Sequence, residues 1–170
     1  MPEVLIISDS HGSTEELAAI KKRHSPEFMI HCGDSELEMD APELDGFIKV
    51  AGNCDADARL PEEQTSTIGG LHFFIAHGHL HQVKTNPMAI AYRAQELEAQ
   101  VVCFGHTHMA GAEKVGQQLL INPGSILLPR RRTEKTYVLM TWDTLEDIRV
   151  DFYTMEGSWL DELSLRTSLT

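Results

Sequence analysis

Aspartate, histidine and asparagine recur beside glycine at five points of the chain, each directly after a short apolar run. Carboxylate, imidazole and amide groups without a thiolate cluster suit Mn²⁺, Fe, Zn²⁺ or Ni²⁺ better than Ca²⁺ or an iron–sulfur cluster. One such residue after a strand is ordinarily a turn residue, but five stretches together predict a metal site. The stretches are Asp9-Ser10-His11, Gly33-Asp34, Gly52-Asn53, His77-Gly78-His79 and Gly105-His106-Thr107-His108.

The number of candidate ligands favours two ions over one. A single tetrahedral site takes four ligands, whereas two ions with a bridging carboxylate and open positions can use seven. Two ions roughly 3.5–4 Å apart suit phosphoester hydrolysis, because they stabilise both the attacking and the leaving oxygen. Since residues two apart in an extended chain point to the same side, each of the pairs 9/11 and 106/108 is expected to grip one ion. The seven candidates are Asp9, His11, Asp34, Asn53, His77, His106 and His108.

Strands and helices alternate in the first third of the chain, which predicts an α/β layered fold. Apolar runs predict buried strands at 4–7, 28–30 and 47–50, and each run ends at one of the motifs. A helix from Ser13 to about Arg23 begins with a capping box, Ser13 to Glu16, and turns Leu17 and Ile20 inward. Ligands at the carboxyl ends of strands in such a sheet meet in one crevice.

The rest of the chain is richer in strands. Gly69-Gly70 predicts a hairpin between 65–68 and 71–76, and a helix with Asn86 as N-cap should run from Pro87 to about Glu98. Ile90, Ala94 and Leu97 are expected to face inward on this helix. Further strands are predicted at 101–104, 111–115, 118–121, 137–142 and 148–154. No repeat or linker interrupts the chain, so residues 1–170 are expected to form one domain.

Composition narrows the class of protein. Hydrophobic residues make up 42% of the chain, too many for a disordered protein, and no apolar run approaches the length of a membrane span. The formal charge of −12 disfavours a nucleic acid polymer as partner, because its phosphates would be repelled. Cys32, Cys54 and Cys103 are too few and too far apart for a disulfide framework. The chain shows no leader sequence at Met1, so we expect a cytoplasmic protein.

Taken in order, the motifs D-S-H, G-D, G-N, H-G-H and G-H-T-H resemble those of the calcineurin-like metallophosphoesterase superfamily. Within it, the chain is similar to the small bacterial and archaeal phosphodiesterases of the YfcE type, from about residue 3 to residue 154, including Asn122-Pro123-Gly124-Ser125. The resemblance implies two mixed β-sheets packed as a sandwich with helices on the outside. It also implies the ligand sets: Asp9, His11 and His108 for the first ion, Asn53, His77 and His106 for the second, and Asp34 as the bridge.

The function expected from this resemblance is hydrolysis of small phosphodiesters by a hydroxide that bridges two divalent ions. Mn²⁺ is our first choice of ion, with Fe, Zn²⁺ or Ni²⁺ as alternatives. Asp34, Asn53 and His77 are the expected catalytic residues. The family allows a homo-oligomer, a dimer or a tetramer. A phosphomonoesterase and a non-catalytic metal-binding scaffold, as in a eukaryotic retromer subunit of similar fold, are the alternatives; retention of all seven ligand types favours the enzyme over the scaffold.

The third motif departs from the common family pattern. Many superfamily members have Gly-Asn-His followed by Glu or Asp, and that His can protonate the leaving group, whereas this chain has Gly52-Asn53-Cys54-Asp55, as do YfcE-like proteins. A thiol has no particular fitness as the acid in this step. We therefore expect a preference for aryl phosphodiesters, whose leaving groups need less protonation. Asp55 is interpreted either as a residue that orients the ligands or as a turn residue.

Five further features of the sequence are potential parts of the site. His79, Asn122 and Ser125 are candidates to contact the substrate or to support the ligands, and His31 is a candidate packed support. The basic run Arg130-Arg131-Arg132 could attract an anion, pair with acidic groups of another subunit, or simply be solvated.

Overall fold

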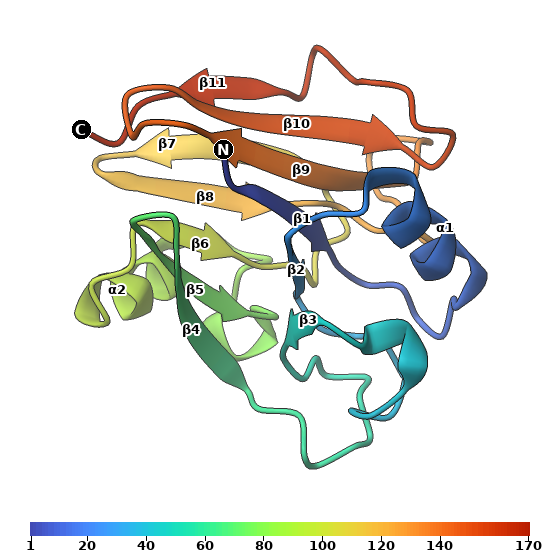
Figure 1. The fold of residues 1–170 in the computed structure, drawn as a ribbon. Coiled ribbons are helices and arrows are strands. Elements are labelled where there is room, and N and C mark those ends of the chain that lie inside the picture. The colour runs from blue at the N-terminus through green and yellow to red at the C-terminus, as the bar shows by residue number, and fades with distance from the viewer.

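The computed structural model describes all 170 residues and contains two mixed β-sheets packed face to face (Figure 1). Hydrogen-bonded neighbours in the first sheet are β11 (Leu165–Thr167), β10 (Ile148–Thr154), β9 (Thr136–Trp142), β1 (Glu3–Ile7), β2 (Phe28–His31) and β3 (Phe47–Lys49). The second sheet has the order β4 (Glu63–Ile68), β5 (Leu71–Ala76), β6 (Val101–Cys103), β8 (Gln118–Asn122) and β7 (Gly111–Val115). The predicted sandwich is confirmed.

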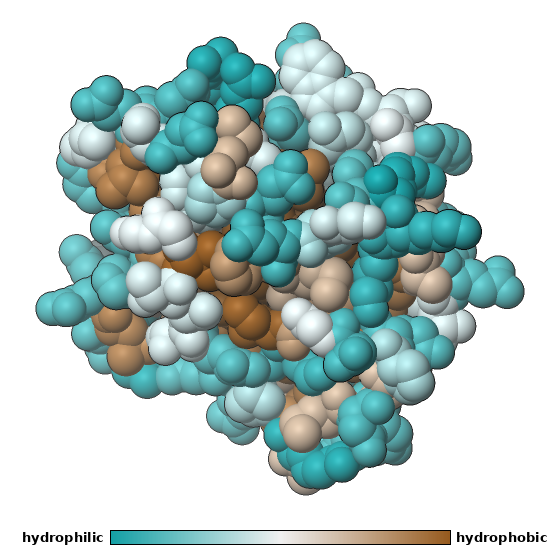
Figure 2. Space-filling model, viewed as in Figure 1, coloured by the Kyte–Doolittle hydropathy of each residue, from teal (hydrophilic) through white to brown (hydrophobic).

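Successive side chains of a strand point to opposite faces of its sheet, so each buried strand contributes to two layers of the core. In β1, Val4 and Ile6 join a cluster of 20 buried residues between the sheets, whereas Leu5 and Ile7 face the opposite side. Figure 2 shows apolar surface gathered in the middle of the molecule and ringed by hydrophilic side chains. Burial on both faces explains why β1 reads as a continuous apolar run.

The two α-helices cover the outer faces of the sheets. Leu17 and Ile20 of α1 (Glu15–His24) pack with Leu5 and Ile7, and Ile90 and Ala94 of α2 (Met88–Glu96) pack with residues of β5 and β6. The inward-facing residues of α1 are thus confirmed. In α2, Ile90 and Ala94 are buried as predicted, but Leu97 lies just past the helix end and is 37% exposed.

Both helix starts differ slightly from the predictions. The N-cap of α1 is Thr14, and the Ser13 hydroxyl donates to the Glu16 carboxylate, so these two residues pair with each other rather than capping the backbone. Pro87 is the N-cap of α2, yet the Asn86 side chain still accepts the Met88 N–H at 3.0 Å. Asn86 therefore caps the helix from one position earlier than the N-cap.

Parallel pairing brings the motifs to one edge. β1, β2 and β3 run parallel to one another, as do β5, β6 and β8, so the carboxyl ends of each set lie together. The hairpin around Gly69-Gly70 pairs Ile68 with Leu71 as predicted. Strand β11 and the short 3₁₀ helices Pro42–Leu44 and His79–His81 were not predicted, because three-residue elements carry too little periodicity. No helix is both long and apolar enough to span a membrane.

Candidate metal centre

Most of the predicted ligands sit on left-handed backbone. The φ angles are 53° at Asp9, 42° at His11, 57° at Asp34, 71° at His106 and 59° at His108. Such values are uncommon outside glycine and collect at functional sites, where the surrounding structure enforces them. The extended-chain argument for the pairs 9/11 and 106/108 was therefore wrong: these loops are tightly turned. Asp9 and His11 still come within 3.8 Å of each other, through the turn at these residues rather than through extended backbone.

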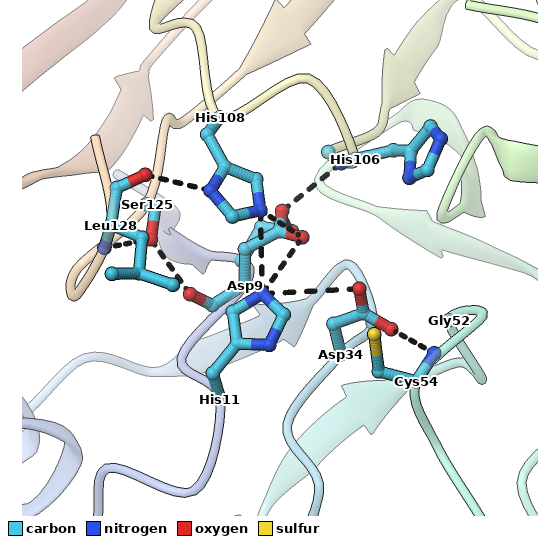
Figure 3. A network of polar contacts seen from close by, with 12 residues as sticks. Asp9, His11, Asp34, Gly52, Cys54, His106, His108, Ser125 and Leu128 are labelled. Carbon is cyan, nitrogen blue, oxygen red and sulfur yellow. Dashed lines mark hydrogen bonds and ion pairs between the residues drawn. The ribbon is translucent and has the colours of Figure 1, made fainter. Parts of the chain in front are cut away.

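Asp9, His11 and His108 form a close cluster. The Nε2 atoms of His11 and His108 lie 3.3 Å apart, and the Asp9 Oδ1 atom is 3.2 Å from His108 Nε2 and 3.8 Å from His11 Nε2. Figure 3 shows the two rings facing each other across Asp9. The structure thus brings together the three residues expected to bind the first ion.

The outer nitrogens of the two rings fix which atoms face inward. His108 Nδ1 is 2.6 Å from the carbonyl oxygen of Leu128, and His11 Nδ1 is 2.9 Å from a carboxylate oxygen of Glu36. Both partners can only accept, so each Nδ1 carries a proton and each Nε2 is the ring nitrogen that faces Asp9. His108 Nε2 lies 3.2 Å from Asp9 Oδ1, and in the neutral ring this atom and His11 Nε2 would present lone pairs beside the Asp9 carboxylate. This donor set fits a divalent cation.

His77 and His106 lie on the other side of the carboxylates. His77 Nε2 is 2.9 Å from Asp9 Oδ1 and 3.3 Å from Asp34 Oδ2, and its ring centroid is 5.0 Å from that of His106. The His106 ring points away from Asp9 in Figure 3, although its backbone N–H donates to Asp9 Oδ2 at 3.0 Å. Burial, and then the neighbouring His77, lower the pKa of His106 to about 4. His106 is therefore neutral at pH 7, as a metal ligand must be.

Asp9 and Asp34 occupy the centre. Burial alone would raise the pKa of Asp9, but hydrogen bonds with His108 and His77 hold it far below the ordinary range, so the carboxylate stays ionised. Asp34 Oδ2 lies 3.3 Å from His77 and 3.9 Å from His11, so it reaches both sides.

Glycine leaves room for both carboxylates. A Cβ atom on Gly105 would collide with Asp9, and one on Gly52 would collide with Asp34. The glycines in these two motifs are therefore required by the close approach of the carboxylates, which explains why they accompany the candidate ligands.

The third motif lies at the exposed rim. Asn53 is exposed, and its amide lies 3.6 Å from Cys54 Sγ. The Cys54 sulfur belongs to a group with His11 and Asp34 in which the ligand atoms are within 4.8 Å of one another. Partial burial, followed by the charge of Asp34, raises the pKa of the Cys54 thiol. The thiol therefore stays protonated at pH 7, which argues against a cysteine nucleophile.

Asp55 holds two of the ligand loops together. Its Oδ2 accepts the backbone N–H groups of Asp34 at 2.8 Å and Gly52 at 2.7 Å, and its Oδ1 accepts that of Glu36 at 2.7 Å. Of the two interpretations offered for Asp55, these contacts favour the residue that orients the ligands.

The remaining predicted residues differ in position. His79 is partly buried, with its Nδ1 atom 3.2 Å from that of His77. Asn122 is buried and donates to the Gly105 carbonyl at 3.3 Å and to Thr107 Oγ1 at 2.9 Å. Ser125 is also buried and donates to the Asp9 carbonyl at 2.7 Å. Asn122 and Ser125 thus hold the ligand loops from behind, and direct substrate contact stays a prediction for His79.

Sequence reasoning missed three partners of the ligands. They are the carboxylate of Glu36, the carbonyl of Leu128, and the hydroxyl of Ser8, which donates to Asp9 Oδ2 at 2.5 Å. Ser8 directly precedes the first motif and could have been suspected from its position. Glu36 and Leu128 have no signal in the sequence, because only the folded loops bring them to the histidines.

Comparison with known proteins agrees with the family that the motifs resemble. A sequence model of the calcineurin-like phosphoesterase superfamily domain matches residues 3–145. The probable metallophosphoesterase YsnB of Bacillus subtilis is 46% identical over 168 residues, covering 98% of this chain and 99% of YsnB. The phosphodiesterase YfcE of Escherichia coli K12 is 27% identical over 113 residues, which is 61% of this chain and 57% of YfcE.

Among solved structures, a crystal structure from Streptococcus pneumoniae TIGR4, described as a predicted phosphoesterase, is 34% identical and superimposes with a TM-score of 0.93. The match covers 98% of this chain and 97% of that one. The solved structure therefore has the same fold over nearly the whole chain, and the YsnB sequence aligns with this chain along almost its entire length.

Proposed function

Since the chain belongs to the calcineurin-like phosphoesterase superfamily, and is thus a metal-dependent hydrolase of phosphoesters, we propose that it hydrolyses small phosphodiesters with two divalent ions. The observation that carries this proposal is the convergence of two carboxylates with imidazoles on both sides. Asp9 and Asp34 lie between the ring of His11 on one side and that of His77 on the other, all within 4 Å.

The proposed ligand sets follow the two sides. Asp9, His11 and His108 would hold the first ion, and Asn53, His77 and His106 the second. Asp34 would bridge them, which its contacts with His11 and His77 support. Carboxylate, imidazole and amide ligands favour Mn²⁺, with Fe, Zn²⁺ or Ni²⁺ as alternatives.

Bound ions would supply a hydroxide nucleophile at neutral pH and neutralise charge on the phosphoryl group. The protein residues do the rest. Asp9 is buried, so its carboxylate is held in one position beside the proposed ions. Asn53 is exposed, so its amide can contact a phosphoryl oxygen of the substrate. The Cys54 thiol, which follows Asn53 where many family members have a His, is a weak proton donor. This supports a preference for aryl diesters over alkyl diesters.

The test combines metal analysis with assays on bis(4-nitrophenyl) phosphate and 4-nitrophenyl phosphate. We expect two ions per chain in the wild type, with Mn²⁺ giving the highest activity, and faster hydrolysis of the diester. Asp34→Asn should lose an ion and more than about 100-fold in activity, since replacing even a supporting partner of a ligand costs about 10–100-fold.

Asp45→Asn is the matched control, because Asp45 is exposed and its side chain makes no hydrogen bond or ion pair. It makes the same chemical change outside the site and should leave activity intact. A wild-type protein without metal, together with an unchanged Asp34→Asn variant, would overturn the proposal. Faster hydrolysis of the monoester would replace the diesterase with a phosphomonoesterase.

A further inference from the structure

Residues Ser125 to Arg130, the 125–130 segment, are bound tightly to the metal centre. Ser125 Oγ donates to the Asp9 carbonyl at 2.7 Å and accepts the Leu128 N–H at 2.8 Å. The Leu128 carbonyl accepts a hydrogen bond from His108 Nδ1 at 2.6 Å, and the Arg130 N–H donates to the His108 carbonyl at 2.9 Å. Figure 3 shows Ser125 and Leu128 directly beside His108 and Asp9. Four hydrogen bonds thus hold the backbone of this segment in a defined position beside the metal centre.

The segment brings a free cation to the rim of the site. Arg130 is exposed, and its guanidinium makes no hydrogen bond or ion pair. By contrast, Arg132 in the same basic run pairs with Glu134 at 3.2 Å and Glu162 at 2.6 Å. The Arg130 N–H is hydrogen bonded to the carbonyl oxygen of the predicted ligand His108, so Arg130 stands directly beside the metal centre.

The charge of Arg130 has no assigned role in the hydrolysis itself. A phosphodiester carries one negative charge, and two divalent ions with two carboxylates already give the centre a net charge of about +2. A substrate with further negative charge would be repelled by a chain whose formal charge is −12. A guanidinium at the rim offsets this repulsion, and its planar fork matches a phosphate or carboxylate.

Leu128 indicates how such a group would reach Arg130. Its side chain is 53% exposed, its own carbonyl oxygen contacts His108, and Arg130 follows two residues later in the segment. Two residues span at most about 7 Å. A short apolar spacer crossing Leu128 would therefore carry an anionic group from the scissile phosphate to Arg130.

We propose that Arg130 binds a second anionic group of the substrate, so that the preferred substrates are phosphodiesters with a phosphate or carboxylate on one short ester arm. This inference rests on the proposed diesterase activity. It makes Arg130 a specificity-determining residue outside the metal ligands.

The test uses two substrates with the same leaving group, 4-nitrophenyl ethyl phosphate and 4-nitrophenyl 2-carboxyethyl phosphate, with the protein loaded with Mn²⁺. The wild type should favour the carboxylate substrate through a lower KM, and added salt should reduce this preference because a rim contact is screened. Arg130→Gln should lower kcat/KM for the carboxylate substrate about tenfold more than for the ethyl substrate, as expected for loss of a charge-assisted contact.

Two further variants separate charge from position. Arg130→Lys should restore part of the preference, since a lysine keeps the charge but not the fork. Arg131→Gln removes the same charge one residue along the same loop and should retain the wild-type preference.

Three results would overturn the inference. An equal loss on both substrates in Arg130→Gln would mean that Arg130 acts on the scissile phosphate or on folding. Equal loss of preference in Arg131→Gln would mean that only the general field matters. No preference in an active wild type would refute the second anionic group while leaving the diesterase intact, whereas a wild type inactive on both substrates would overturn the proposed function and this inference with it.

Discussion

On one side of the central carboxylates, the rings of His11 and His108 are each fixed by a hydrogen bond from Nδ1, to Glu36 and to the Leu128 carbonyl. On the other side, the His106 ring makes no hydrogen bond, and Asn53 is exposed. We call Asp9, His11 and His108 the anchored half, and Asn53, His77 and His106 the open half.

This difference indicates two roles. Ligands held in place before the ion arrives lose little freedom on binding, so a preorganised site binds more tightly. The open half must order Asn53 and the His106 ring when its ion binds. The anchored half should therefore hold its ion more tightly, and the open half should exchange its ion and contact the substrate more readily.

The largest effect is expected when one ligand is removed from each half in turn. His108→Ala removes a ligand from the anchored half and should abolish tight binding of one ion, with a loss of activity on the order of 10³-fold, beyond the roughly 10–100-fold cost of losing a supporting partner. His106→Ala should weaken only the more loosely held ion. Calorimetric titration of metal-free protein with Mn²⁺ would resolve the two affinities. Identical affinities and identical losses in the two variants would contradict the division into halves.

The second prediction concerns a support of the anchored half. His31 is fully buried, accepts the Gly33 N–H at 3.1 Å and lies 2.9 Å from Ser10 Oγ, so it ties the loops of Asp9 and Asp34 together. Burial lowers the pKa of His31 to about 4, against about 6.5 in the unfolded chain. Protonation is therefore penalised in the folded state, and stability is full above pH 6.5 and falls as the pH drops toward 4.

This loss should reach about 3 kcal/mol, because each pKa unit corresponds to about 1.36 kcal/mol. Denaturant unfolding of metal-free protein between pH 7.5 and 4.5 measures it. His31→Gln cannot titrate and serves as the reference. If wild type and His31→Gln lost stability in parallel over this range, a buried neutral His31 would be refuted.

The third prediction tests the supports of the ligands rather than the ligands. Glu36→Gln keeps the shape of the side chain but removes the negative charge beside His11 Nδ1, and should weaken binding of the tighter ion about 10–100-fold. His79→Gln, beside His77 Nδ1 in the open half, should affect only the weaker ion. The same two-site titration distinguishes them. A weaker second ion in Glu36→Gln, with the first unchanged, would reverse the assignment of the halves.

Much of this architecture could be predicted from the sequence, for a physical reason. Val4 to Ile7 and Val101 to Cys103 are buried on both faces, so their strands read as apolar runs, and parallel pairing then fixes where the following motifs meet. The groups that fix the rings of His11 and His108 could not be predicted. Glu36 and the Leu128 carbonyl reach the histidines only through turned loops, and Glu36 itself has a φ of 55° that no residue pattern encodes.

The smallest expected effect concerns a group that neither half contains, an efficient proton donor for the leaving oxygen. Cys54 lies near His11 and Asp34, and its raised pKa makes it a weak acid. Cys54→His should raise the rate on an alkyl diester relative to an aryl diester, because only the poor leaving group needs protonation. A positioned general acid contributes about 10²–10⁴-fold, but this pocket is not built for an imidazole, so the gain should be at most about tenfold.

Matched assays on methyl 4-nitrophenyl phosphate and dimethyl phosphate, across pH 6 to 9, would measure that ratio. Cys54→Ser is the control, since it keeps a small side chain without adding an imidazole. A loss of more than about 100-fold in Cys54→Ser on the aryl diester would identify the thiol as a nucleophile. An equal gain on both diesters in Cys54→His would show that the new ring acts on the metal ions. A gain confined to the alkyl diester would place the missing acid at the rim of the open half, beside Asn53, where the substrate's leaving oxygen must then lie.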